Sequence, residues 1–164
     1  MPPAEIAIRR LGTATLIAAA LALGIAGCTS QEDEETPSAC LTEAPAYLQA
    51  LRAAPGEVRL EGTTQISDCL TPEQDGGELA RVGSAMIGAA TELNGEALAD
   101  PGGPATVQLG YLSAAVSRGA DSIHTDLARR VTTAAQFSPQ GSGALPAEFL
   151  RGFGRGYEAG RESG

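Results

Sequence analysis

The chain contains no lysine and no tryptophan, and its aromatic side chains are few, with three Tyr and three Phe among 164 residues. All 11 basic residues are arginine, against 20 acidic residues. Without lysine, no Ser–Lys catalytic dyad can form. The formal net charge of −9 disfavours nucleic-acid binding, because an acidic surface repels the phosphate backbone.

The residues that usually build an active site or a metal site are also scarce. The single histidine, His124, has Asp121 three residues before it, and one imidazole with one carboxylate is too few ligands for a metal site. Asp121 is explained more simply as the cap of a helix that begins there. No serine stands in a G-x-S-x-G motif, and neither phosphate-binding glycine motif is present. We therefore expect no catalytic residue, no metal and no cofactor.

Residues 1–27 have the pattern of a secretory signal. Arg9 and Arg10 precede an uncharged apolar run over residues 11–26, which is shorter than the ~20 residues that span a bilayer. The run ends in Leu-Gly-Ile-Ala-Gly-Cys over residues 23–28, which resembles the lipobox of bacterial lipoproteins. The resemblance implies that residues 1–27 are removed and that Cys28 is lipidated. The expected location is extracytoplasmic, anchored to the cell membrane or, if the cell has one, to the outer membrane.

Residues 28–39 follow the lipidation motif with almost no apolar side chain and with four consecutive acids. Such a segment cannot bury surface, so we expect an acidic, disordered tether. Removal of residues 1–27, which contain Glu5, Arg9 and Arg10, changes the formal net charge from −9 to −10. The mature protein is therefore strongly acidic.

Three cysteines are present, and with Cys28 assigned to lipid, Cys40 and Cys69 are the two that remain. Outside the cytoplasm such a pair is expected to be oxidised. A bridge between them would close a loop of about 30 residues and stabilise the fold by roughly 3 to 4 kcal/mol. The spacing is not the C-x-x-C of redox proteins. We predict a structural Cys40–Cys69 disulfide.

The pattern from residue 40 to residue 138 predicts an all-α domain. Pro45 suits a first helical turn, and residues 57–66 suit one short strand or an extended loop. Residues 71–74 (Thr-Pro-Glu-Gln) have the form of a capping box, with a second possible helix start at Asp75 and an end that frays at Asn94-Gly95. Short loops between helices favour a small antiparallel bundle of four to five helices.

One apolar stripe runs from Pro104 to Ala134 at helical spacing. Gly119, however, suits the C-terminal end of a helix, and Asp121 suits the cap of the next one. Two helices with a break near Gly119 are therefore favoured over one long bent helix.

After an expected linker at residues 139–144, residues 145–164 should form a last helix. It contains four tetrads that each end in glycine, three of which start with an aromatic residue. In a helix the glycines would form a smooth groove beside the aromatic side chains, although each interior glycine costs ~1 kcal/mol of helix stability. Two possibilities stay open: the helix packs on the domain with its aromatics in the core, or it orders only on a partner.

Taken together, these features predict a membrane-anchored extracytoplasmic lipoprotein with a non-enzymatic interaction or envelope-associated role. Its expected partners are the membrane, through the lipid on Cys28, and another envelope protein. Residues 29–117 hold 14 acids against three arginines, whereas residues 118–164 are close to neutral. The candidate contact residues therefore lie in the C-terminal part: Arg118, Arg129, Arg130, Phe149, Gly152, Phe153, Gly156, Tyr157 and Gly160.

Two other functions stay open. A small-molecule binding module would need an apolar pocket between the helices, near Tyr47, Met86 and Tyr111. The scarcity of aromatic side chains weakens this interpretation, because such side chains usually line ligand pockets. An enzyme with an unrecognised site is the third possibility.

Overall fold

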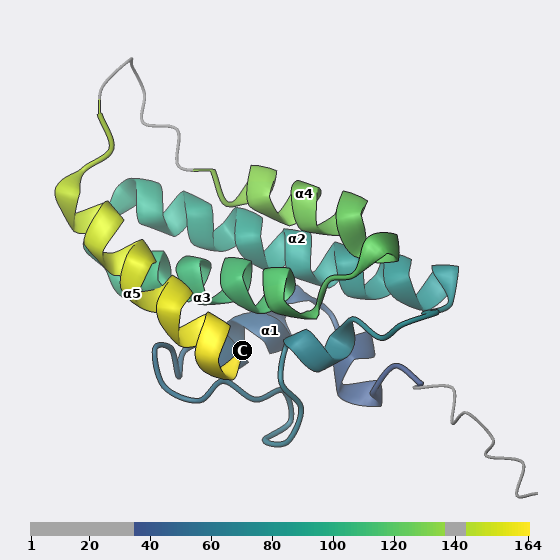
Figure 1. Ribbon diagram of the computed structural model, residues 1–164. Helices are drawn as coiled ribbons and strands as arrows, with labels where there is room; N and C mark the ends of the chain where they lie inside the picture. The colour runs from purple at the N-terminus through teal and green to yellow at the C-terminus, as the bar shows by residue number, and fades with distance from the viewer. Residues whose placement is uncertain (1–34, 137–143) are drawn as a thin grey trace, which may run out of the picture. The chain divides into compact units, whose positions relative to one another are not determined.

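The computed structural model describes residues 35–136 and 144–164 (Figure 1). Within these ranges the chain forms five α-helices and three short 3-10 turns, and no β-strand. The α-helices are α1 (Ala44–Leu51), α2 (Gly76–Ala99), α3 (Pro104–Gly119), α4 (Thr125–Ala134) and α5 (Ala147–Ser163), and the 3-10 turns are η1 (Ser38–Leu41), η2 (Ser67–Cys69) and η3 (Ser122–His124). The predicted all-α class is confirmed. The signal segment, Cys28 and most of the expected linker at 139–144 lie outside the described residues.

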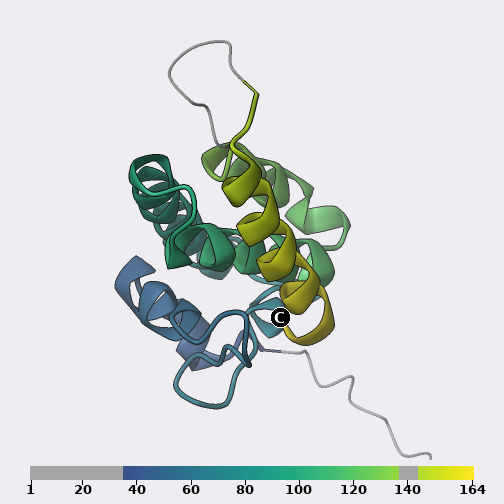
Figure 2. The same cartoon turned by 90° about the vertical axis from the view of Figure 1, so that its left-hand side faces the viewer.

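Helix α3 lies at the centre of the fold and contacts α1, α2, α4, α5 and η2. It is apolar on most of its surface, and nearly all of its residues up to Val116 are buried. Helix α5 crosses α3 in both views of the ribbon (Figures 1 and 2). A helix buried on all sides needs small side chains where its neighbours come close, and this requirement explains the alanines and glycine along α3.

The predicted break near Gly119 is confirmed. Helix α3 ends at Gly119, and the Asp121 side chain accepts a hydrogen bond from the backbone N–H of Ile123 to cap η3, which leads into α4. The break lets α4 turn back and pack against both α2 and α3. One continuous helix would have carried the apolar residues of α4 away from this core.

The start of α2 differs from the capping box predicted at residues 71–74. The helix begins at Gly76, where the Asp75 side chain accepts hydrogen bonds from the N–H groups of Gly77 and Glu78. Asp75, the second possible start, is thus the cap. Glu73 has a left-handed φ of 62°, which cannot belong to a helix. The capping box does not form, because residues 71–74 belong to the loop between η2 and α2. In that loop the Gln74 side chain donates hydrogen bonds to Thr36 and to the Cys69 carbonyl.

The predicted fraying at Asn94-Gly95 is wrong, since α2 continues to Ala99. The Asn94 side-chain N–H donates a 3.1 Å hydrogen bond to the Gln136 carbonyl at the end of α4. Leu93 and Ala97 are buried on either side of this point. Tertiary contacts therefore keep this stretch helical, although its local sequence favours the end of a helix.

The Cys40–Cys69 disulfide is confirmed, with a Cα–Cα distance of 5.4 Å. It joins η1 to η2, and the Tyr47 hydroxyl donates a 2.9 Å hydrogen bond to the Cys40 carbonyl beside it. Thr36 and Ala39 are buried against the domain. The expected disordered tether over 28–39 is therefore too long at its end, because the residues from Thr36 onward belong to the fold.

Residues 57–66 form an extended loop, the second of the two predicted possibilities. Val58 and Leu60, which alternate with polar residues, are buried in the core. A single bridge between Leu60 and Thr64 closes the loop. No second strand lies beside it among the described residues, so the pairing does not extend into a sheet.

Candidate functional site

The glycine face of α5 lies directly against α3. A Cβ atom at Gly156 would overlap the carbonyl oxygen of Val107, and one at Gly160 would overlap that of Tyr111. From the other side, a Cβ at Gly110 of α3 would overlap the Phe153 carbonyl oxygen. The two backbones therefore touch, which only glycine allows. The predicted glycine groove exists, and a helix of the same chain fills it.

The aromatic residues of α5 lie beside this glycine face. Phe149, Phe153 and Tyr157 follow one another along the helix, with ring centroids 5.7 and 6.1 Å apart. Phe149 is buried, and Phe153 packs against the hydrophobic core. Of the two possibilities left open by the sequence, the structure has the packed helix, but only Phe149 is buried, whereas Phe153 and Tyr157 are half-buried.

The three candidate arginines do not form one surface. Arg129 pairs with Asp126 on α4. Arg130, also on α4, lines a small groove of about 210 Å³ together with the exposed Ile123. Arg118 lies at the end of α3, where its Nη1 donates 3.1 Å hydrogen bonds to the carbonyls of Glu162 and Gly164. Arg118 therefore holds the last turn of α5.

His124 belongs to a buried polar network. Its side chain is fully buried, with Nδ1 2.8 Å from the Asp121 carboxylate and Nε2 3.3 Å from the Gln74 side-chain oxygen. The Gln74 side-chain nitrogen donates to the Cys69 carbonyl at 3.0 Å and to the Thr36 hydroxyl at 2.7 Å. The network ties η3 to the loop after the disulfide and to the residues before η1. Asp121 is close to His124 in the sequence, but Gln74 is 50 residues away, so local sequence patterns could not identify it as a partner of His124.

A hollow that sequence reasoning missed opens between residues 35–37, the segment from η2 to Pro72, and the end of α3. Its volume is about 460 Å³. A Cβ at Gly119 would overlap the Ser67 carbonyl oxygen, so glycine is what lets α3 end against η2. The disulfide and the Gln74 hydrogen bonds hold the remaining walls. These walls come from three distant parts of the sequence, which is why no local motif marked the hollow.

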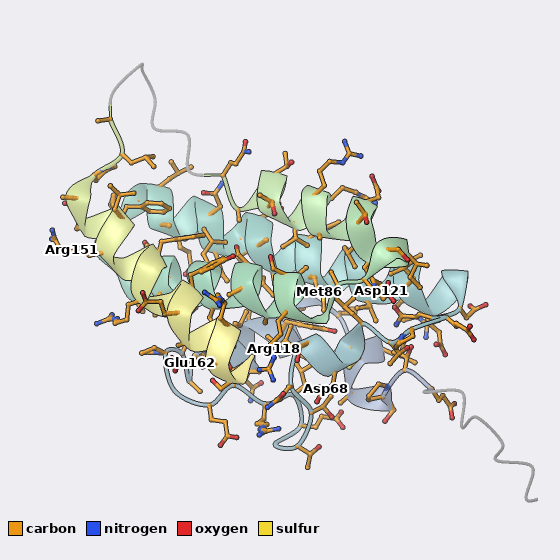
Figure 3. The ribbon with its side chains drawn as sticks, in the orientation of Figure 1. Asp68, Met86, Arg118, Asp121, Arg151 and Glu162 are labelled. Atoms are coloured by element: carbon orange, nitrogen blue, oxygen red, sulfur yellow. A yellow bond between two sulfur atoms is a disulfide. The ribbon has the colours of Figure 1, made fainter. Side chains whose placement is uncertain are left out.

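The hollow combines a cation, two carboxylates and two hydroxyls with apolar walls. Arg118, Asp68 and Glu35 supply its charges, and Figure 3 shows Arg118 and Asp68 near the end of α5. Ser67 donates to the Gly164 carbonyl, whereas the buried Thr71 hydroxyl has no hydrogen-bond partner. Unpartnered buried polar groups are rare and call for an explanation.

The pocket predicted near Tyr47, Met86 and Tyr111 is not open to solvent, because all three side chains are fully buried in the core. The Tyr111 hydroxyl donates a 2.8 Å hydrogen bond to the Ser163 carbonyl and accepts one from the Val58 N–H. Burial raises the pKa of the Tyr47 phenol well above its usual value. These side chains fill the interior instead of lining a ligand site.

Within residues 35–136 and 144–164, no group of three or more His, Cys, Asp or Glu side chains is placed to hold a metal ion. None of the helices in the same ranges has the length and hydropathy of a membrane span. No protein-family model matches the chain, and neither a curated protein nor a solved structure does so.

Proposed function

We propose that the protein is a lipid-anchored extracytoplasmic lipoprotein that acts by binding and not by catalysis. The observation that carries the proposal is the pairing of Cys40 with Cys69. A structural disulfide is typical of proteins outside the cytoplasm. It leaves Cys28, at the end of the lipobox-like sequence, as the one cysteine of three available for lipid. The disulfide and the leader sequence thus agree on the same compartment.

The arrangement of polar side chains supports a binding role. His124, the residue type most often used in acid–base catalysis, is enclosed by Asp121 and Gln74 and is sealed from solvent. The glycine face of α5 is occupied by α3 while the helix is docked. An envelope partner would therefore contact outward-facing side chains such as Arg129 and Arg130 on α4.

Small-molecule binding is the second candidate function, and the hollow beside Arg118 is the observation that favours it. Ligand sites are concave and hold a few convergent polar groups among apolar walls. The hollow has that composition, whereas the interior around Tyr47 does not. The two binding functions are compatible, because they use different surfaces.

Anchoring is tested by expressing the full chain in a bacterium supplied with an alkyne analogue of palmitate. We expect the label in the wild-type protein, in the membrane fraction, and its loss in a Cys28→Ser variant. A Cys40→Ser/Cys69→Ser variant is the matched control and should keep the label. Label that survives Cys28→Ser, or a wild-type protein without label, would contradict the proposal.

A further inference from the structure

Helix α5 is joined to the rest of the domain almost entirely through one neighbour. It lies along α3, and its contacts with the other elements are slight or absent among the described residues (Figures 1 and 2). By contrast, α1, α2 and α4 each pack against at least two other helices. Removal of α5 would therefore separate no other pair of helices.

The main hydrophobic core is built without α5. All buried members of that core come from residues 39–135. Val107 and Ala114 of α3 and Phe149 of α5 are also buried, but they lie outside the main core. The α5 side chains that pack against the core stay partly exposed, and they are Phe153 and Ala159. The buried side chains of the main core would therefore keep one another as neighbours if α5 left.

Away from α3, α5 has little to keep it helical. Its buried residues are Phe149, Gly156 and Gly160, so only one of the three has a side chain to bury. Interior glycines, of which α5 has four, weaken a helix because they lose more backbone freedom than other residues. Most of the stability of a helix in a protein comes from tertiary packing. Docking on α3 and helix formation are therefore coupled in α5.

Side-chain hydrogen bonds hold α5 at its last turn, residues 162–164. Arg118 donates two hydrogen bonds of 3.1 Å to carbonyl groups there. The Tyr111 hydroxyl donates one of 2.8 Å, and the Ser67 hydroxyl donates another. The earlier turns are held by the backbone contacts of the glycines. Loss of the hydrogen bonds at 162–164 would therefore remove the main polar attachment of the whole helix.

We propose that α5 is a detachable cover of α3, which undocks and loses its helical structure as one unit while α1 to α4 stay folded. The open state exposes the face of α3 that α5 covers, including Val107, Gly110, Tyr111 and Ala114. Opening thus gives the protein an apolar surface that the docked state hides. The inference goes beyond the proposed binding role and does not depend on the lipid anchor.

The test is hydrogen–deuterium exchange of the full chain, purified in detergent and followed by mass spectrometry of its peptides. Partial openings of a native protein make the amides of the opening unit exchange faster than those of the core. We expect amide protection factors in α5 to be lower than those in α2 and α3 by about tenfold or more. Equal protection in α5 and α2 would overturn the inference.

A variant of the main core distinguishes opening of α5 from unfolding of the whole domain. Leu93 is a buried core residue of α2. Leu93→Ala destabilises the docked and open states alike, so exchange in α2 should become faster by about tenfold or more while exchange in α5 stays unchanged. The same acceleration in both helices would mean that α5 opens only with the whole domain. Val82→Ala, a smaller change in the same helix and core, provides the comparison if Leu93→Ala does not fold.

A second variant tests whether α5 opens as one unit. Arg118→Ala removes two hydrogen bonds to the last turn, so protection should fall by a similar factor, about fivefold or more, along all of α5, including the first turn at Phe149. Arg129→Ala, which changes an arginine on α4 that pairs with Asp126, is the matched control and should exchange like the wild type. A loss of protection confined to residues 162–164 would show that α5 frays from its end, and would overturn the inference.

Discussion

Tyr47 illustrates how one side chain connects the local sequence to stability. Its ring is fully buried, and its hydroxyl donates to the carbonyl of Cys40, next to the disulfide. Tyr47, Leu48 and Leu51 have helical spacing after Pro45, and in the structure Tyr47 and Leu51 are the buried residues of α1. What the spacing left open was whether the ring lines a ligand pocket or fills the core.

The buried phenol predicts a specific loss of stability in alkali. Burial raises the pKa of Tyr47 in the folded state, so the unfolded chain loses its proton first as the pH increases. The contribution is therefore complete below about pH 10 and declines above it, with a slope that approaches about 1.4 kcal/mol per pH unit. The measurement is urea unfolding of the wild type and of Tyr47→Phe at pH 8 and at pH 11.

In that experiment, Tyr47→Phe should be less stable at pH 8 by about 1–3 kcal/mol, because the Cys40 carbonyl loses its donor. The difference between variant and wild type should then shrink at pH 11. Tyr157→Phe, on the partly buried face of α5, serves as the control and should follow the wild type. A Tyr47→Phe difference that is the same at both pH values would refute the assignment.

At the scale of elements, the contact between α3 and α5 is the feature that joins the C-terminal segment to the domain. Glycines at 110, 156 and 160 let the two helix backbones touch, and Arg118 holds the last turn of α5. The interior glycines weaken α5 as an isolated helix. Its stability therefore comes from packing against α3 and not from its own propensity.

Two glycines of α5, two residues apart, should respond in opposite ways to alanine. Gly156→Ala places a methyl group against the Val107 carbonyl and should destabilise the protein by about 1–3 kcal/mol. Gly154→Ala meets no atom within 4 Å and should stabilise it by about 0.5–1 kcal/mol. Urea unfolding of both variants measures the difference. Two substitutions with the same effect would mean that α5 does not dock as described.

At the scale of the whole molecule, the disulfide and the polar network around Gln74 join segments that are far apart in the chain. The bridge links residues with a sequence separation of 29. Gln74 contacts both Thr36 and His124, which are farther apart in the sequence than the two cysteines. The same contacts form the walls of the hollow beside Arg118. Stability and the candidate ligand site therefore depend on one set of cross-links.

Removal of the bridge should weaken the fold by an amount set by loop length. A Cys40→Ala/Cys69→Ala variant should lose about 3–4 kcal/mol in free energy of unfolding. The wild type measured with reductant should show a similar loss, whereas the variant should not respond to reductant. A variant as stable as the oxidised wild type would show that the bridge does not stabilise the domain.

The sequence by itself determined the helical class, the disulfide, the break after Gly119 and the helix over the last residues. Each of these rests on local rules: apolar spacing, caps, glycine and proline positions, and the count of cysteines. Helix propensity also indicated an early end to α2 at Asn94-Gly95. That prediction is wrong, because the contact with Gln136 and the burial of Leu93 and Ala97 keep the helix intact there.

Only the tertiary structure decided which surfaces of these elements are in contact. The glycine tetrads of α5 were compatible with a free groove or a filled one, because one helix carries no information about its neighbour. Tyr47 and Tyr111 were compatible with a pocket or a core for the same reason. The hollow beside Arg118 is made by residues from positions 35 to 119, brought together by Gly119, Gln74 and the disulfide. Contacts between distant segments depend on the packed geometry of the whole domain, which no local pattern contains.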